Sequence, residues 1–136
     1  MESLQANNAL VTRTQGTGMD VVFLHGWGMN SGAFTSFIPY ISDNVRVTTI
    51  DLPGFGENAA ILPKSYNVDE LASALVASLP DNCLLVGWSL GGLVAQKLAL
   101  IAPQKLVGLV TIASTPRFIA GPCWPGIAAD LLKMFE

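Results

Sequence analysis

Ser89 has neighbours that could make it a nucleophile. The stretch GWSLGG, residues 87–92, places this serine two positions from a glycine on either side. Glycines at these positions allow a tight turn that exposes the serine hydroxyl for attack on a carbonyl carbon. A serine in a glycine-rich turn can also be an ordinary helix N-cap. The flanking elements must decide between these two interpretations.

Those elements favour the nucleophile. The apolar run CLLVGW, residues 83–88, is typical of a strand buried on both faces, and residues 90–102 have the apolar spacing of a helix. Ser89 then lies between a buried strand and a helix, where a rigid sheet can hold a strained backbone. The amide of Leu90 would lie at the positive end of the helix dipole. It could therefore donate to an oxyanion during acyl transfer.

A second oxyanion donor is expected from the loop HGWGMN, residues 25–30. Its two glycines permit close approach of the backbone, and the main-chain amide of Trp27 is the natural donor. The indole of Trp27 could be an ordinary surface aromatic, or it could line an acyl chain together with Trp88. Packing in the core is an equal alternative for Trp88.

His25 and Asp51 lie at predicted strand ends and could be mistaken for catalytic partners. His25 is the only histidine of the sequence, but hydrogen bonding within the oxyanion loop suits its position better than the role of general base. Asp51 precedes a proline-glycine turn that its carboxylate should stabilise. In this type of site the acid and the histidine follow the serine along the chain. After Ser89 the sequence has only the acids Asp130 and Glu136, and no histidine.

Strands and helices alternate along the chain. Apolar or β-branched runs predict strands over residues 9–14, 20–26, 45–54, 83–88 and 106–114. Helices are predicted over residues 31–40, 68–79 and 90–102. This alternation favours βαβ units and an α/β fold with a doubly wound, mostly parallel sheet.

Local signals support the helix boundaries. Ser31 could cap the first helix, and Asn67 with Glu70 forms a variant of the capping box before the second. In the third helix one face should be apolar, made by Val94, Leu98 and Ile101. After residue 114 the composition turns to proline, glycine and aromatic residues, so the chain should leave the sheet there.

Composition bounds the class of protein. The 136 residues are 51% hydrophobic and 12% charged, which excludes a disordered chain. The net charge of −3, without a cluster of basic residues, argues against nucleic-acid partners.

No apolar run approaches the roughly 18 residues of a membrane span, and no signal peptide is recognised at the start, so a cytoplasmic location without membrane association is expected. Cys83 and Cys123 suit neither a disulfide framework nor a metal site, and Cys83 is interpreted as a core residue.

Three motifs together resemble the α/β-hydrolase superfamily: HGWG (25–28), DLPGFG (51–56) and GWSLGGLVA (87–95). The tryptophans of the first and third motifs, with WPGI (124–127), are similar to the pimeloyl-[acyl-carrier protein] methyl ester esterases of bacterial biotin synthesis. The resemblance extends over nearly all of the sequence.

The resemblance implies a serine carboxylesterase. Ser89 would be the nucleophile, the amides of Trp27 and Leu90 the oxyanion donors, and all three residues substrate contacts. The substrate would be a methyl-esterified acyl chain on an acyl-carrier protein, and no metal or organic cofactor is implied.

The acid and histidine of this family lie on later strands, and a helical cap lies between. Residues 1–116 are therefore expected to form the N-terminal part of the hydrolase core, and residues 117–136 the start of the cap. The full-length enzyme is expected to be a monomer. Residues 1–136 alone are expected to be inactive and to self-associate, because the strand over 106–114 would leave an open sheet edge.

Other functions remain compatible with the same motifs. A nucleophile turn does not disclose the acyl acceptor or the bond that is cleaved, so an acyltransferase, a cofactor-free haloperoxidase or a C–C hydrolase is possible on this fold. The absence of a second histidine also keeps a non-catalytic binding module open.

Overall fold

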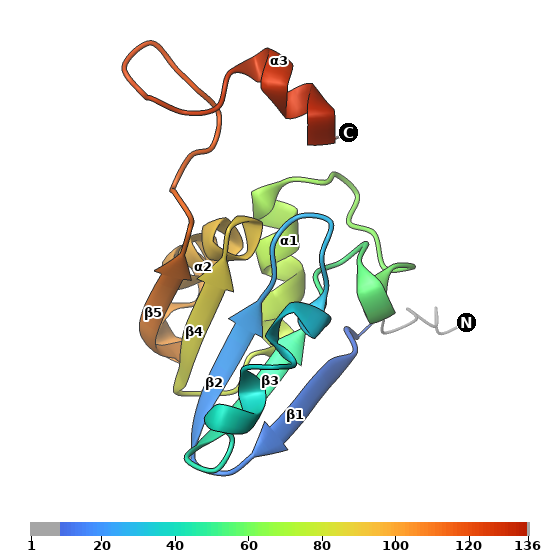
Figure 1. Cartoon of the computed structure of the whole chain (residues 1–136), viewed down its shortest axis with the longest axis vertical. Coiled ribbons are helices and arrows are strands. Elements are labelled where there is room, and N and C mark those ends of the chain that lie inside the picture. Colours follow the sequence, from blue (N-terminus) through green and yellow to red (C-terminus); the bar gives the residue numbers. More distant parts are fainter. Residues whose placement is uncertain (1–8, 136) are drawn as a thin grey trace, which may run out of the picture.

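The computed structural model describes residues 9–135, and within them it contains a five-stranded sheet (Figure 1). The strands are β1 (Thr12–Gly16), β2 (Met19–Leu24), β3 (Val45–Ile50), β4 (Cys83–Trp88) and β5 (Leu106–Ile112). Their spatial order is β1-β3-β2-β4-β5, with β1 antiparallel to β3 and every other pair parallel. The predicted α/β class with a mostly parallel sheet is confirmed.

The two faces of this sheet are covered differently, one by α-helices and the other by 3-10 turns. One face carries α1 (Val68–Leu75) and α2 (Leu90–Ile101), whereas the short α3 (Ala129–Leu132) lies beyond the carboxyl ends of the parallel strands (Figure 1). The opposite face carries two 3-10 turns, η1 (Ser31–Phe34) and η2 (Ile38–Tyr40). Further 3-10 turns are η3 (Gly56–Asn58), η4 (Val76–Ser78), η5 (Pro103–Lys105) and η6 (Lys133–Phe135).

Two apolar clusters hold these layers together. Val22 and Leu24 of β2 are buried in the cluster beneath α1 and α2. Val21 and Phe23 are buried in the cluster beneath η1 and η2. Because successive side chains of a strand point to opposite faces, a strand buried on both faces has the continuous apolar run that the sequence shows.

The start of α1 follows its local signal. The Asn67 side chain accepts a hydrogen bond of 2.9 Å from the amide of Glu70, as the capping pattern predicts. The α-helix ends at Leu75, and η4 takes the place of the last predicted turns.

The predicted helix over residues 31–40 is wrong. This segment forms η1 and η2, and its N-cap is Asn30, whose side chain accepts a 2.8 Å hydrogen bond from Gly32. Ser31 is not the cap. Its amide donates to the carboxylate of Asp51 at 2.7 Å, a long-range contact that a local pattern cannot reveal.

Several strand boundaries also differ from the predicted ones. β1 begins at Thr12 and continues to Gly16, because its antiparallel register pairs Thr12 with Ile50 and Gly16 with Arg46. β2, β3 and β5 end two to four residues earlier than predicted. β5 stops before Ala113, whose φ of 47° takes the chain out of the extended conformation.

The predicted apolar face of α2 is confirmed at two of its three positions. Val94 and Leu98 are fully buried, whereas Ile101, on the last turn, is 41% exposed. Cys83 is fully buried as expected, and its burial raises the pKa of the thiol.

Candidate active site

Ser89 occupies a strained turn between β4 and α2. Its φ of 54° and ψ of −117° are rare for a residue with a side chain, and the residue is half-buried. The Ser89 amide donates to the carbonyl of Ile112 at 2.9 Å, and its carbonyl accepts from the amides of Gly92 and Leu93. The sheet and the helix therefore both hold the strained residue in place.

The glycines of the turn are required by close packing. A Cβ atom on Gly87 would lie 2.4 Å from the carbonyl oxygen of Gly91. A Cβ atom on Gly91 would lie 2.3 Å from the carbonyl oxygen of Leu24 on β2. Both distances are far below normal contact, so a larger residue at either position would displace the turn from the sheet.

Ser114 also supports the Ser89 turn, a role that no sequence motif indicates. Its hydroxyl donates a 2.8 Å hydrogen bond to the carbonyl of Ser89. The residue follows β5, and 25 positions separate it from Ser89, so no spacing pattern links them. Ser114 thus ties the turn to the strand beside β4.

The loop after β2 lies directly against the Ser89 turn. A Cβ atom on Gly26 would lie 3.3 Å from Cβ of Ser89 and 3.4 Å from the ring of Trp88. Trp88 is half-buried and packs against the cluster beneath η1 and η2, which supports the core-packing alternative for this residue. The structure therefore brings together the loop of Trp27 and the turn of Ser89.

The two predicted oxyanion donors are main-chain amides at this junction. Leu90 is the first residue of α2, and Trp27 follows Gly26 in the adjoining loop. No hydrogen bond from either amide to another protein group is found within residues 9–135. Both donors thus remain available to a ligand, and their role stays a prediction.

His25 is fully buried beneath the loop. Its Nε2 accepts a 2.9 Å hydrogen bond from the amide of Leu52, so Nδ1 carries the proton and donates to the carbonyl of Gly26 at 2.8 Å. Burial lowers the pKa of His25, which keeps the ring neutral. Because both nitrogens are engaged, His25 orders the loops after β2 and β3, as the sequence suggested.

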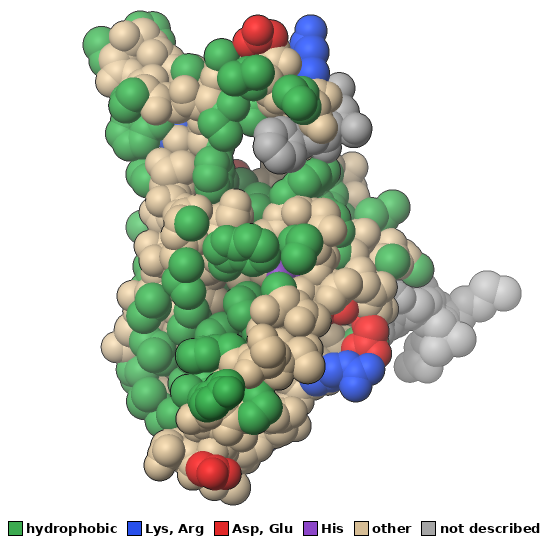
Figure 2. Space-filling view, viewed as in Figure 1, with side chains coloured by type: hydrophobic (Ala, Val, Ile, Leu, Met, Phe, Trp, Pro, Cys, Tyr) green, Lys and Arg blue, Asp and Glu red, His purple; other side chains and the backbone are tan. Residues whose placement is uncertain are grey.

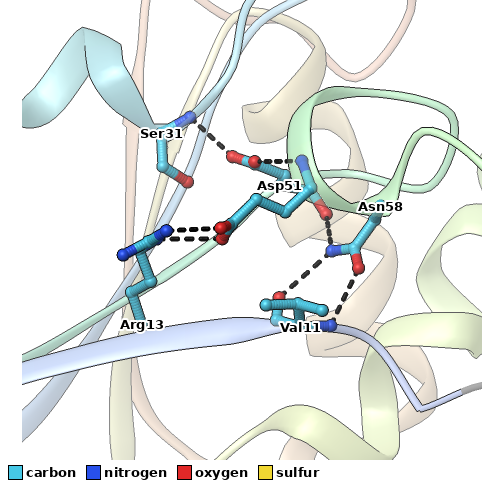
Figure 3. A network of polar contacts seen from close by, with 6 residues as sticks. Val11, Arg13, Ser31, Asp51 and Asn58 are labelled. Carbon is cyan, nitrogen blue, oxygen red and sulfur yellow. Dashed lines mark hydrogen bonds and ion pairs between the residues drawn. The ribbon is translucent and has the colours of Figure 1, made fainter.

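Asp51 stabilises the neighbouring turns through a polar network (Figure 3). Its carboxylate accepts hydrogen bonds from the amides of Ser31 at 2.7 Å and Glu57 at 2.9 Å. Burial by itself would raise the pKa of Asp51, but these hydrogen bonds outweigh it and lower the pKa below its ordinary value. Asp51 therefore acts as an ionised anchor for two loops.

The same network reaches β1. Asn58 donates to the carbonyls of Asp51 and Val11 and accepts from the Val11 amide, while Arg13 and Glu57 form an ion pair on the surface (Figure 3). Asn58 is fully buried, and its three hydrogen bonds join the chain before β1 to the turn after β3.

An aromatic cluster flanks the Trp27 side of the site. Phe55 and Tyr66 both pack against Trp27, with ring centroids 5.4 Å and 5.7 Å away. The sequence analysis did not assign Phe55 or Tyr66 to the site. Both lie in the connection between β3 and α1, Phe55 within the DLPGFG motif and Tyr66 just before α1, and no spacing pattern links either of them to Trp27.

The described residues provide no evidence for a metal site. Within residues 9–135, no three His, Cys, Asp or Glu side chains come together in a way that could bind a metal ion. Among the same residues, no helix has both the length and the apolar character to cross a membrane.

Comparison with known proteins supports the relationship suggested by the motifs. A family model described as the alpha/beta hydrolase family matches residues 21–135. The pimeloyl-[acyl-carrier protein] methyl ester esterase of Pseudoalteromonas atlantica is 46% identical over 130 residues, which are 96% of this chain and 50% of that protein. The protein of the same name from Aeromonas hydrophila is 47% identical over 121 residues, 89% of this chain and 48% of that protein. The chain thus spans about half the length of the curated relatives it matches.

Solved structures of esterases have the same fold. The esterase of Exiguobacterium antarcticum is 25% identical with a TM-score of 0.81, over 92% of this chain and 49% of that one. The thermophilic esterase of Thermogutta terrifontis is 28% identical with a TM-score of 0.74, over 82% of this chain and 42% of that one. The family match, the sequence relatives and these structures together show that the chain belongs to the alpha/beta hydrolase family.

Proposed function

We propose that residues 1–136 form the nucleophile-bearing half of a serine carboxylesterase that hydrolyses the methyl ester of pimeloyl-[acyl-carrier protein] in biotin synthesis. The observation that carries this proposal is the strained Ser89 at the end of β4, with a φ of 54°, in a chain whose relatives bear that esterase name. Residues 1–116 would belong to the hydrolase core and residues 117–136 to the start of a cap.

In the proposed reaction, the Ser89 hydroxyl attacks the ester carbonyl. The amides of Trp27 and Leu90 stabilise the negative charge that develops on the carbonyl oxygen. The C–O bond to the methoxy group breaks, methanol leaves, and an acyl-enzyme remains until water releases the acid. The close approach of Gly26 to Ser89, where a Cβ atom on Gly26 would lie 3.3 Å from Cβ of Ser89, supports this proposal, because Trp27 follows Gly26 and Leu90 follows Ser89 along the chain.

In this proposal the general base comes from outside residues 1–136. His25, the only histidine of the sequence, uses both ring nitrogens in hydrogen bonds to Leu52 and Gly26. Proton transfer from Ser89 to His25 would break the bond to Leu52 inside the core. We therefore expect the acid and the histidine in a second half, and no ester hydrolysis above background by residues 1–136 alone.

A chimera tests the proposal. Residues 1–136 are joined to the part of the Pseudoalteromonas atlantica esterase that follows its matched 130 residues. The chimera should hydrolyse short methyl and p-nitrophenyl esters, and Ser89→Ala should lower kcat/KM about a thousandfold or more, because the attacking oxygen is removed. The control is Ser73→Ala, at an exposed position of α1, which should leave the rate unchanged.

If Ser89→Ala and Ser73→Ala had equal activities, Ser89 would not be the nucleophile. If the chimera transferred the acyl group to an added alcohol faster than to water, an acyltransferase would replace the esterase as the assigned function.

A further inference from the structure

Three aromatic rings from two connections of the chain meet around Trp27, the residue that follows Gly26 beside the Ser89 turn. Trp27 follows β2, Phe55 follows β3 and Tyr66 precedes α1. Each ring contacts the other two edge-on, with centroid separations of 5.4 Å, 5.7 Å and 6.2 Å. Edge-to-face contacts of this kind stabilise a defined relative orientation of the rings.

Tyr66 is held at both its ring and its hydroxyl. The hydroxyl donates a 3.0 Å hydrogen bond to the carbonyl of Pro53. The ring lies over the turn at Gly54, where a Cβ atom would lie only 3.4 Å from the ring and where φ is +87°. Burial raises the pKa of Tyr66 to about 12, so the hydroxyl remains a donor over the neutral range.

Trp27, in contrast, is held mainly by its neighbours. The residue is 45% exposed, and it lies in a turn that is closed by a 3.2 Å hydrogen bond from the amide of Met29 to the carbonyl of Gly26. Phe55 and Tyr66 supply the ring contacts that the exposed indole has. Loss of the Tyr66 ring would therefore free the indole on one side.

We infer that Tyr66 is a positioning residue that fixes the Trp27 indole as an apolar wall beside Ser89, and that it thereby favours ester substrates with an apolar acyl chain over acetyl esters. The positioning role of Tyr66 is argued from its contacts with Trp27, Phe55 and Pro53 and does not depend on the proposed esterase function. The selection among acyl esters rests on the proposed esterase function, since it requires substrate at Ser89.

The first experiment uses residues 1–136 as they are. The three tryptophans give three indole N–H signals in a nitrogen-15 NMR spectrum, and Trp27→Phe identifies the signal of Trp27. Tyr66→Ala should shift and narrow this signal because the indole gains mobility, whereas Tyr66→Phe should have a smaller effect because it keeps the ring contacts. The matched control is Tyr40→Ala, at the other tyrosine, which is 83% exposed. An unchanged Trp27 signal in Tyr66→Ala would overturn the positioning role.

The second experiment measures selectivity in the chimera. Tyr66→Ala should lower the kcat/KM ratio of hexanoyl to acetyl esters about tenfold through KM, with kcat changed less than about twofold. Trp27→Ala should have the same effect, and Tyr40→Ala none. A Ser89-dependent chimera with an unchanged ratio in Tyr66→Ala would refute the selectivity while leaving the esterase function intact. Activity that does not depend on Ser89 would instead refute the esterase function, and the NMR result would still decide the positioning role.

Discussion

Single polar side chains at the ends of β2 and β3 organise the loops around Ser89. His25 links the loop after β2 to the amide of Leu52, and Asp51 links the turns at Ser31 and Glu57. Each of these side chains satisfies main-chain groups that loops would otherwise leave unpaired near the core. The loop that carries the predicted oxyanion donor Trp27 is therefore held by hydrogen bonds that do not themselves belong to the chemistry.

We predict that Asp51→Asn lowers the free energy of unfolding of residues 1–136 by about 1–3 kcal/mol at pH 7. The carboxylate accepts from two amides, and an asparagine would face one of them with its own donor group. Urea denaturation at fixed protein concentration measures this difference. The exposed Asp43→Asn is the control, and it should change stability little.

The pH dependence of this difference has a definite sign. The folded state lowers the pKa of Asp51, so its carboxylate contributes stability that is present above the unfolded pKa of about 3.9 and is lost as pH falls through the folded pKa. The gap between wild type and Asp51→Asn should therefore shrink below about pH 4. A gap that stayed constant or widened in acid would show that the ionised carboxylate does not stabilise the fold.

The two helices on one face of the sheet begin for different reasons. α1 begins where its own sequence dictates, because the Asn67 side chain reaches the amide of Glu70 within one turn. The start of α2 depends on packing, since Gly91 must approach the carbonyl of Leu24 on β2. The Ser89 turn is thus set by the contact of a helix with a neighbouring strand.

Removal of the Asn67 cap should destabilise the protein through the start of α1. Asn67→Ala should lower the free energy of unfolding by about 1 kcal/mol, because the Glu70 amide loses its acceptor. Asn44→Ala, at an exposed asparagine outside the helices, is the matched control. If the two variants were equally stable by urea denaturation, the cap would contribute nothing to the fold.

In the whole molecule, the two edges of the sheet differ in chemistry. β1 is exposed along its length and carries polar side chains, among them Arg13. β5 exposes Val107, Leu109, Val110 and Ile112, and Figure 2 shows hydrophobic side chains gathered on this side of the molecule. Within residues 9–135 no strand pairs with β5 beyond β4. Charged edges resist association, whereas an apolar edge invites it.

We therefore predict that residues 1–136 form dimers or larger species through β5. Size-exclusion chromatography with light scattering should show a mass above that of the monomer, and replacing Val110 and Ile112 together by lysine should restore the monomer. Val11→Lys, an exposed position next to the opposite edge, should leave the association unchanged. A monomeric wild type, or an equal response to lysine at both edges, would contradict the role of β5.

Sequence patterns predicted the parts of this protein that depend on local physics. The buried strand over residues 83–88, the cap at Asn67 and the location of Ser89 between a strand and a helix all follow from apolar runs, side chains within one turn and glycine spacing. The mostly parallel sheet also followed, because strands that alternate with helices have few ways to pair.

Tertiary structure decided the contacts between segments that are distant in sequence. Ser31 was expected to cap a helix, but its amide binds Asp51, 20 positions away, and the segment became two 3-10 turns. Ser114 and Tyr66 gained their places beside the site in the same way. Such contacts form only when the sheet brings its strand ends together, and no periodicity or spacing along the chain encodes which loop side chains will then meet.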